Sequence, residues 1–296
     1  MTSLALNTQT YREYLPDPGL ADLVSCVWVQ RVSRNAPPYE HRTVPNGCVE
    51  LTWVVGGEEV SVVGPRRRAV VDRVAPGCAV AGLRFRPGVP HEVLGATACE
   101  LLGAGTTLDV LWGDRAARAS ERIHLAPTPE AVVRILQREV LARRAAAPGP
   151  DALVAEIIRR LQPWRRGEVR ELASDLFISP RQLRRRCIAA FGFGPKTLQR
   201  ILRFQGFLAL AQDVHRPDAG LSRLAAAAGY FDQAHLTREC RALTELTPAA
   251  FVREMRASCG ENHDHGASFA VPRRALAGRP LRPSLGDACA SSLAAL

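Results

Sequence analysis

The same helix–turn–helix pattern occurs twice between residues 169 and 251, and this duplication constrains the fold more than any other feature. The first copy reads VRELASDLFISPRQLRRRCIAAFGFGPKTL and the second reads LSRLAAAAGYFDQAHLTRECRALTELTPAAF. After the turn, equivalent residues such as Arg185 and Arg238 are 53 positions apart, whereas before it Leu172 and Leu224 are 52 apart. A fixed period of this kind marks a duplicated structural unit. We therefore expect two such units, with one extra residue in the second turn.

Apolar residues three or four apart predict the buried face of each helix, because such positions share one side of a helix. In the first copy these residues are Leu172, Ala173, Leu176, Ile178, Leu183 and Cys187. In the second copy they are Leu224, Ala225, Ala228, Leu236, Cys240 and Leu243. Ser179 and Pro180 suit the N-cap and first position of the second helix. A long apolar-patterned helix from Pro195 to Asp213 is predicted to join the two copies.

The opposite face of each second helix carries side chains that suit DNA bases. In the first copy they are Arg181, Gln182, Arg184 and Arg185. In the second copy they are Gln233, Ala234, Thr237 and Arg238. Arginine pairs with guanine and glutamine with adenine, while alanine or threonine can contact the thymine methyl group. We predict that these eight residues bind DNA. The alternative, solvated polar residues on surface helices, is disfavoured by the register of the two copies.

The positive charge of the chain is concentrated around the duplicated motif. The formal net charge is +10. Residues 1–150 have 17 basic and 15 acidic side chains, whereas residues 151–256 have 18 basic and 11 acidic ones. A basic segment is often only a solvated face, but here it coincides with the repeat. This distribution favours contact with phosphates.

The N-terminal half is predicted to be rich in strands. Five segments rich in valine and aromatic residues are separated by Pro, Gly and Asn clusters, and they cover residues 24–32, 49–55, 60–64, 69–75 and 80–87. They indicate a small antiparallel sheet or barrel. Helices are expected at 108–123, after Thr107, and at 128–145, beginning with Thr128 as N-cap.

Changes in composition divide the chain into three parts. The Pro/Gly-rich stretch AAAPGP at 145–150 is predicted to be a linker, and Asp151 can cap the helix that follows it. The predicted fold class is α+β, with an N-terminal domain over 1–150, an all-α domain over 151–256 and a disordered tail over 257–296.

The cysteines indicate a reduced protein without zinc. The eight cysteines are Cys26, Cys48, Cys78, Cys99, Cys187, Cys240, Cys259 and Cys289, and no two form a C-x-x-C pair. The chain starts without a signal-like segment and contains no apolar run of membrane-spanning length. We therefore expect a cytoplasmic protein with no membrane partner, no metal and no cofactor. The tail trio Cys259, His263 and His265 is not expected to hold a metal.

Residues 151–256 resemble the DNA-binding domain of the AraC family of bacterial transcription regulators. The resemblance rests on S-P-R-Q-L-R-R-R-C followed by F-G-F-G-P in the first unit, and on A-x-x-x-G-Y-x-D-Q-x-H-L-T-R-x-C followed by T-P-x-x-F in the second. It implies that one monomer contacts double-stranded DNA in two successive major-groove segments. Cys187, Cys240 and Thr244 stand where the family usually has an aromatic residue, and Phe177 where glycine often ends the first helix.

The resemblance leaves open whether the protein is an activator or a repressor, whether RNA polymerase is a partner, and whether it is a monomer or a homodimer. The N-terminal half is similar, less specifically, to sensor-like domains that precede this DNA-binding domain in part of the family. Such domains imply a cupin-like barrel that binds a small-molecule effector or dimerises. The effector is unknown, and Trp28, Trp53 and Phe85 line the candidate pocket unless they are plain core.

Two enzyme classes compete with the regulator hypothesis. A metal-dependent cupin-type enzyme fused to a DNA-binding module needs converging histidines and a carboxylate. His41, His91 and His124 are far apart and the strand region has no H-x-H pair. A DNA-repair methyl acceptor needs a four-cysteine zinc site or a Pro-Cys-His nucleophile, and none of the N-terminal cysteines has that context. We predict that the protein is not an enzyme and has no catalytic residues.

Overall fold

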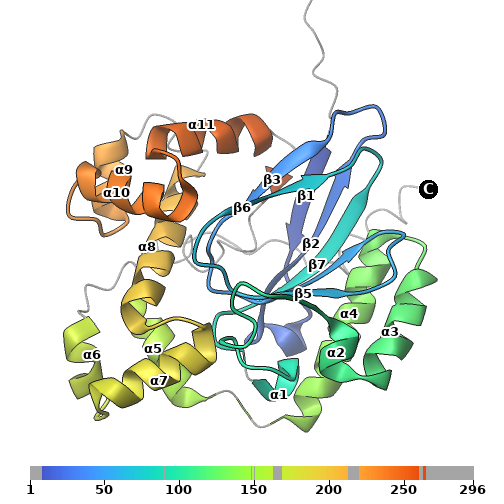
Figure 1. The fold of residues 1–296 in the computed structure, drawn as a ribbon, viewed down its shortest axis with the longest axis horizontal. Coiled ribbons are helices and arrows are strands. Elements are labelled where there is room, and N and C mark those ends of the chain that lie inside the picture. The colour runs from blue at the N-terminus through green and yellow to red at the C-terminus, as the bar shows by residue number, and fades with distance from the viewer. Residues whose placement is uncertain are drawn as a thin grey trace, which may run out of the picture.

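A mainly antiparallel sheet with helices on one face, and a separate group of helices, make up the two parts of the molecule (Figure 1). The computed structural model describes residues 9–89, 91–147, 149, 151–162, 169–212, 220–259 and 263–264. The α+β fold class expected from the sequence is confirmed.

Seven strands form the main sheet, in the order β8-β5-β4-β7-β2-β1-β9, and β3 pairs with β6 in a second sheet. The pairs are antiparallel except for β1 with β9. The strands are β1 (Gln9–Tyr14), β2 (Val24–Val32), β3 (Tyr39–Thr43), β4 (Glu50–Val54), β5 (Ser61–Val63), β6 (Val70–Val74), β7 (Ala79–Phe85), β8 (Gly105–Thr107) and β9 (His263–Asp264). Within the described residues the strand order begins at β8 and ends at β9 without closing on itself, so the main sheet is open. It is therefore not a closed barrel, which was the other architecture that the sequence allowed.

The five predicted strands are confirmed as β2, β4, β5, β6 and β7. The strands that the sequence missed are short or polar: β1 reads QTYREY, β3 reads YEHRT and β8 reads GTT. Such segments lack a clear apolar alternation, and their extended form comes from pairing with a neighbour.

The helices of the N-terminal part are α1 (His91–Leu94), α2 (Leu108–Trp112), α3 (Asp114–His124) and α4 (Pro129–Ala146), with a 3-10 turn η1 (Pro18–Leu20). The prediction of one helix over 108–123 was wrong. Gly113 adopts φ 57° and ψ −142°, which is not helical, and it separates α2 from α3. Thr107 occupies the N-cap position of α2, but its side chain makes no capping hydrogen bond to the helix backbone. Thr128 caps α4 as predicted, its hydroxyl oxygen accepting the Ala131 N–H at 3.2 Å.

The N-terminal core lies between one face of the sheet and α4. Trp53 and Phe85 are buried in it, together with Leu136 of α4. Trp28 belongs to a different cluster, with Tyr11 and Cys26. Its indole covers Gly82, where an added Cβ would lie 2.3 Å from the ring. The structure therefore separates Trp28 from Trp53 and Phe85, and the three do not line one pocket.

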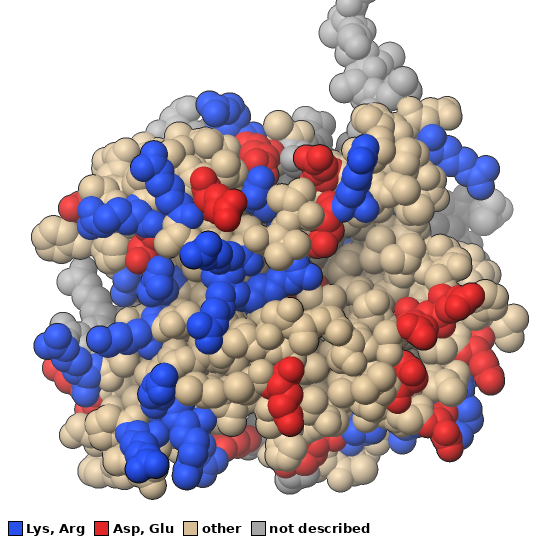
Figure 2. Space-filling view, viewed as in Figure 1, with Lys and Arg blue, Asp and Glu red and all other residues tan. Residues whose placement is uncertain are grey.

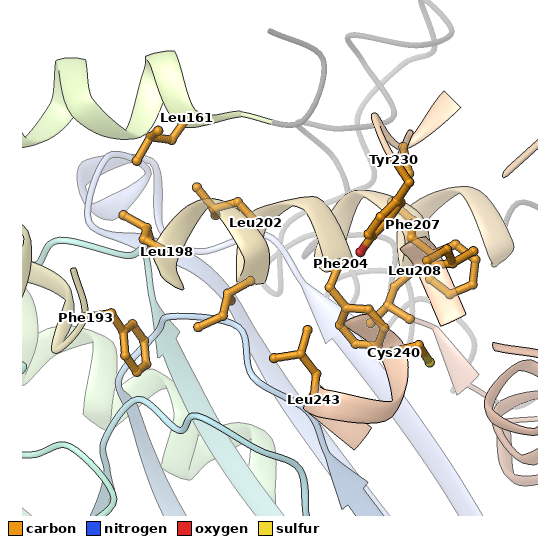
Figure 3. Close-up of a cluster of buried hydrophobic side chains, with 14 of the residues drawn as sticks. Leu161, Phe193, Leu198, Leu202, Phe204, Phe207, Leu208, Tyr230, Cys240 and Leu243 are labelled. Atoms are coloured by element: carbon orange, nitrogen blue, oxygen red, sulfur yellow. The ribbon is translucent and has the colours of Figure 1, made fainter. Parts of the chain in front are cut away.

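The helices of the C-terminal part share a second core around α8 (Figure 3). They are α5 (Ala152–Leu161), α6 (Val169–Asp175), α7 (Pro180–Phe191), α8 (Pro195–Ala211), α9 (Leu221–Ala227), α10 (Gln233–Thr244) and α11 (Pro248–Cys259). Asp151 caps α5 as expected, accepting the Leu153 N–H at 2.8 Å. The long joining helix is confirmed as α8, whose Phe204 and Phe207 are fully buried. Asp213, its predicted end, lies outside the described residues.

Part of the segment predicted to be a disordered tail forms regular structure. The last helix, α11, continues to Cys259, and His263–Asp264 form β9, which pairs in parallel with Tyr11 and Arg12 of β1. The rest of the segment predicted to be disordered, including His265 and Cys289, lies outside the described residues, as do residues 148 and 150 of the predicted linker.

Side chains of the N-terminal part contact the helical part directly. Arg42 of β3 forms an ion pair with Glu254 of α11, its Nε 2.5 Å from Oε1. The Gln205 side-chain amide of α8 donates to the Pro45 carbonyl oxygen at 2.7 Å. Gly88 approaches Phe191 of α7 so closely that an added Cβ would lie 2.7 Å from the ring. The first of the duplicated units is therefore packed against the N-terminal part.

Candidate nucleic-acid interface

Equivalent backbone hydrogen bonds close the first helix of each of the two units. In the first unit the Ile178 N–H donates to the Ala173 carbonyl oxygen at 3.0 Å, and in the second the Tyr230 N–H donates to that of Ala225 at 2.9 Å. These pairs keep the 52-residue offset seen in the sequence before the turn. The extra residue is therefore Phe231, which follows Tyr230 directly. The predicted one-residue insertion is confirmed.

Side chains fix the amino ends of both second helices, α7 and α10. Ser179 and Gln182 form a reciprocal capping box: the Gln182 N–H donates to Ser179 Oγ at 3.2 Å and the Ser179 N–H to Gln182 Oε1 at 2.9 Å. Asp232 caps α10, accepting the His235 N–H at 2.6 Å. The predicted start of α7 at Ser179 and Pro180 is confirmed.

The inward faces of α7 and α10 are buried as the apolar spacing predicted. Leu183, Cys187, Leu236 and Cys240 each have at most 2% of their surface exposed. Burial raises the pKa of the Cys187 thiol to about 12 and also raises that of Cys240. These two cysteines are therefore protonated core residues that hold each helix against its neighbours.

The predicted DNA-binding residues lie on the outer faces of the same two helices. Seven of the eight are exposed, and Thr237 is half-buried with its hydroxyl donating to the Gln233 carbonyl oxygen at 2.9 Å. The four arginines, Arg181, Arg184, Arg185 and Arg238, make no hydrogen bond or ion pair within the described part of the chain. Their guanidinium groups can therefore bind an external anion without breaking an internal contact.

The two glutamines are less independent than the sequence indicated. The side-chain oxygen of Gln182 belongs to the capping box, and that of Gln233 accepts the Ser222 hydroxyl at 2.8 Å. Both amide groups are consequently oriented by the protein. A base would meet a prepositioned side chain, and no pattern in the sequence signalled the Ser222 contact.

Other arginines of the helical part are engaged inside the domain. Arg186 pairs with Asp151, and Arg200 of α8 pairs with Glu239 of α10, its Nε 2.6 Å from Oε2. Arg203 lies over the Tyr230 ring, 5.6 Å from its centroid. These arginines stabilise helix packing, in contrast to the four on the outer faces.

Figure 2 shows that lysine and arginine side chains gather over the helical part, whereas acidic ones are more frequent toward α2 and α3. A hollow of about 530 Å³ adjoins α7. It is lined by Arg181, Arg184 and Arg185 and, from the N-terminal part, by Thr97 and Cys99. The positive face thus extends from α7 to the edge of the N-terminal part.

A second polar cluster lies on the sheet face opposite α4. Arg84 is held between two carboxylates, with Nη1 3.1 Å from Glu13 Oε1 and Nε 2.8 Å from Glu50 Oε1. The Tyr11 hydroxyl donates to Glu13 at 2.9 Å and the Trp28 N–H to Glu50 at 3.2 Å. Burial by itself lowers the pKa of Arg84, but the charges of the surrounding groups, Glu50 foremost among them, together leave that pKa raised. Burial also raises the pKa of Tyr11.

Sequence reasoning missed this cluster because its members come from four strands. Within the described residues, no group of three or more His, Cys, Asp and Glu side chains is arranged to hold a metal ion. No described helix is both long and apolar enough to cross a membrane.

Two family models match the chain. Residues 172–254 match a helix-turn-helix domain, and residues 12–106 match a domain of unknown function (DUF6597). No curated protein matches the sequence. Crystal structures of ToxT from Vibrio cholerae are similar at 7–8% identity. One, of an apo single-residue variant from strain SCE256, covers 83% of this chain and 97% of that one, with a TM-score of 0.42. Another, from strain O395, covers 83% and 98% with a TM-score of 0.41.

The C-terminal match and the paired units define the class: a DNA-binding transcription regulator with an AraC-type helix–turn–helix domain. In this chain the domain follows an N-terminal domain of unknown function, whose match ends at residue 106.

Proposed function

We propose that the chain binds duplex DNA sequence-specifically and reads a bipartite operator through α7 and α10. The observation that supports this proposal is that α7 and α10 share one core and each has exposed arginines on its outer face that make no hydrogen bond or ion pair with a described residue. Because α8 joins the units within that core, each helix can enter its own major-groove segment.

The arginines differ in their contacts within the protein, and we assign them different roles on that basis. Arg185 and Arg238 occupy equivalent positions of α7 and α10 and read bases, guanine being the usual partner of arginine. Arg200 and Arg203 of α8 are held by Glu239 and Tyr230, so they support the helices without reading sequence.

The test is a selection from random duplexes with the full chain. We expect one bipartite consensus whose halves lie about one helical turn, ~10 bp, apart. Arg185→Ala or Arg238→Ala should each relax base preference at one position, by about 1–3 kcal/mol of discrimination. Arg203→Ala, the matched control, should leave the consensus unchanged. Uniform, salt-sensitive binding without a consensus would refute specific recognition.

The N-terminal domain acts in this proposal as a regulatory sensor or dimerisation domain of a cytoplasmic, non-enzymatic protein. The support is its direct contact with the helical part, through Arg42 and Gly88, and its own buried polar cluster around Arg84. A small-molecule effector, a second copy of the chain and RNA polymerase are the partners that fit this role. An effector must bind two states of the protein unequally to change its DNA affinity.

The regulatory role predicts a measurable coupling in the full chain. A metabolite that raises the thermal midpoint of the free protein should also change its operator affinity, and Glu50→Gln should weaken that response. If no metabolite of a broad panel does so, and sedimentation shows a monomer with and without operator, the regulatory role is refuted.

A further inference from the structure

One short segment of the N-terminal part contacts the carboxyl ends of both recognition helices. At its start, Pro65 faces Gly192, the C-cap of α7, where an added Cβ would lie 3.3 Å from Pro65 Cγ. At its end, the Ala69 N–H donates to the carbonyl oxygen of Leu243 in α10 at 2.7 Å. The segment 65–69 therefore extends from one helix–turn–helix unit to the other.

The residues between these two contacts are three consecutive arginines. Arg66 is half-buried, with Nη1 3.9 Å from Asp72 Oδ2. Arg67 and Arg68 are exposed, and neither makes a hydrogen bond or ion pair with any described residue. The loop before β6 lies beside α8 and α10 in Figure 1, and lysine and arginine side chains cover this region in Figure 2.

Segment 65–69 lies between the two recognition helices, and on DNA the minor groove lies between the two major-groove segments that such helices would occupy. When two recognition helices occupy major-groove segments one helical turn apart, the minor groove between them faces the protein, bordered by the phosphates of both strands. Basic side chains that lie between the helices can neutralise those phosphates and release their counterions. A narrow minor groove also concentrates negative potential, which attracts arginine.

We propose that Arg67 and Arg68 form a third contact with DNA, on the phosphates between the two half-sites. This inference rests on the proposed function of α7 and α10. The N-terminal domain would thus belong to the DNA-binding surface itself. The segment is anchored at both ends, by Pro65 and by Ala69, so its arginines are held in place relative to both recognition helices.

The experiment compares full-length Arg67→Ala/Arg68→Ala with the wild type on the selected duplex, between 50 and 200 mM salt. Each lost phosphate contact should reduce the slope of log K against log salt by about 0.9, or about 1.8 for both residues. At 0.1 M salt this corresponds to a loss of affinity on the order of 50-fold. The bases selected should stay the same, and hydroxyl-radical protection between the half-sites should disappear.

Two further double variants serve as controls. Arg118→Ala/Arg138→Ala removes the same charge from exposed positions on α3 and α4, far from α7 and α10 in Figure 1, and should keep the wild-type slope. Arg67→Lys/Arg68→Lys keeps the positive charge and should also keep the wild-type salt slope. A wild-type slope in the alanine variant, or an equal loss in the α3/α4 control, would overturn the inference.

Failure of the proposed function gives a different result. In that case the wild type selects no bipartite sequence at all. The salt slopes on random duplex then still test Arg67 and Arg68 by themselves: a reduced slope supports a phosphate contact, and an unchanged slope refutes it. A urea midpoint within error of the wild type shows that the alanine variant is folded.

Discussion

Replacing Phe177 with glycine should stabilise the protein, although it removes a large apolar side chain. Phe177 ends the first helix of the first unit with φ 53°, in the left-handed region. Its equivalent in the second unit, Gly229, has φ 82°. The Phe177 side chain is 96% exposed, so it contributes almost no buried surface. The substitution therefore relieves backbone strain without opening a cavity.

The expected change in the free energy of unfolding follows from two opposing contributions. A non-glycine residue in the left-handed region costs about 1–2 kcal/mol, which glycine avoids. Glycine adds conformational entropy to the unfolded chain, which lowers stability by about 0.4–1 kcal/mol. The net expectation is a gain of about 1 kcal/mol in the free energy of unfolding.

Urea denaturation of Phe177→Gly and Phe177→Ala isolates the backbone contribution, because both variants lose the ring and only glycine relieves the strain. Phe231 is the matched control: it is 92% exposed but is not among the described residues with positive φ. Phe231→Gly should be less stable than Phe231→Ala by up to about 1 kcal/mol. The reasoning is refuted if glycine is no more stabilising than alanine at position 177.

Three other outcomes follow from the structure. Gly88→Ala should lower the free energy of unfolding by at least about 1–2 kcal/mol, measured in urea, because φ is +85° and the methyl group would meet the Phe191 ring of α7. At pH 8, iodoacetamide should label the exposed Cys99 much faster than Cys48, since burial raises the pKa of the Cys48 thiol to about 12 and only the thiolate reacts. Peptide mass spectrometry of the labelled native protein measures both rates, and equal rates would contradict this prediction. A double-mutant cycle with Arg42→Ala and Glu254→Ala should give a coupling of about 0.5–1 kcal/mol, because both partners are partly exposed, and zero coupling would show that the ion pair does not join the two parts.

Many of the helices were predictable because their signals are local. The caps at Ser179, Asp151 and Thr128 depend on residues two or three positions away, and the buried faces of α7 and α10 depend on spacings of three or four. The break at Gly113 was missed because the apolar and polar pattern continues through it, and only the backbone angles show that the helix stops.

The sequence alone thus determined the duplicated units, their outward-facing arginines and the extra residue of the second turn. Each of these features depends on residues that are close together in the chain, within one unit. Only the tertiary structure brought Glu13, Glu50 and Arg84 together, since their strands β1, β4 and β7 are neighbours or near neighbours only through the sheet order. It also placed segment 65–69 between α7 and α10. Such contacts join residues far apart in the chain, and no local spacing encodes them, because they form only when separate elements bury their apolar faces against one another.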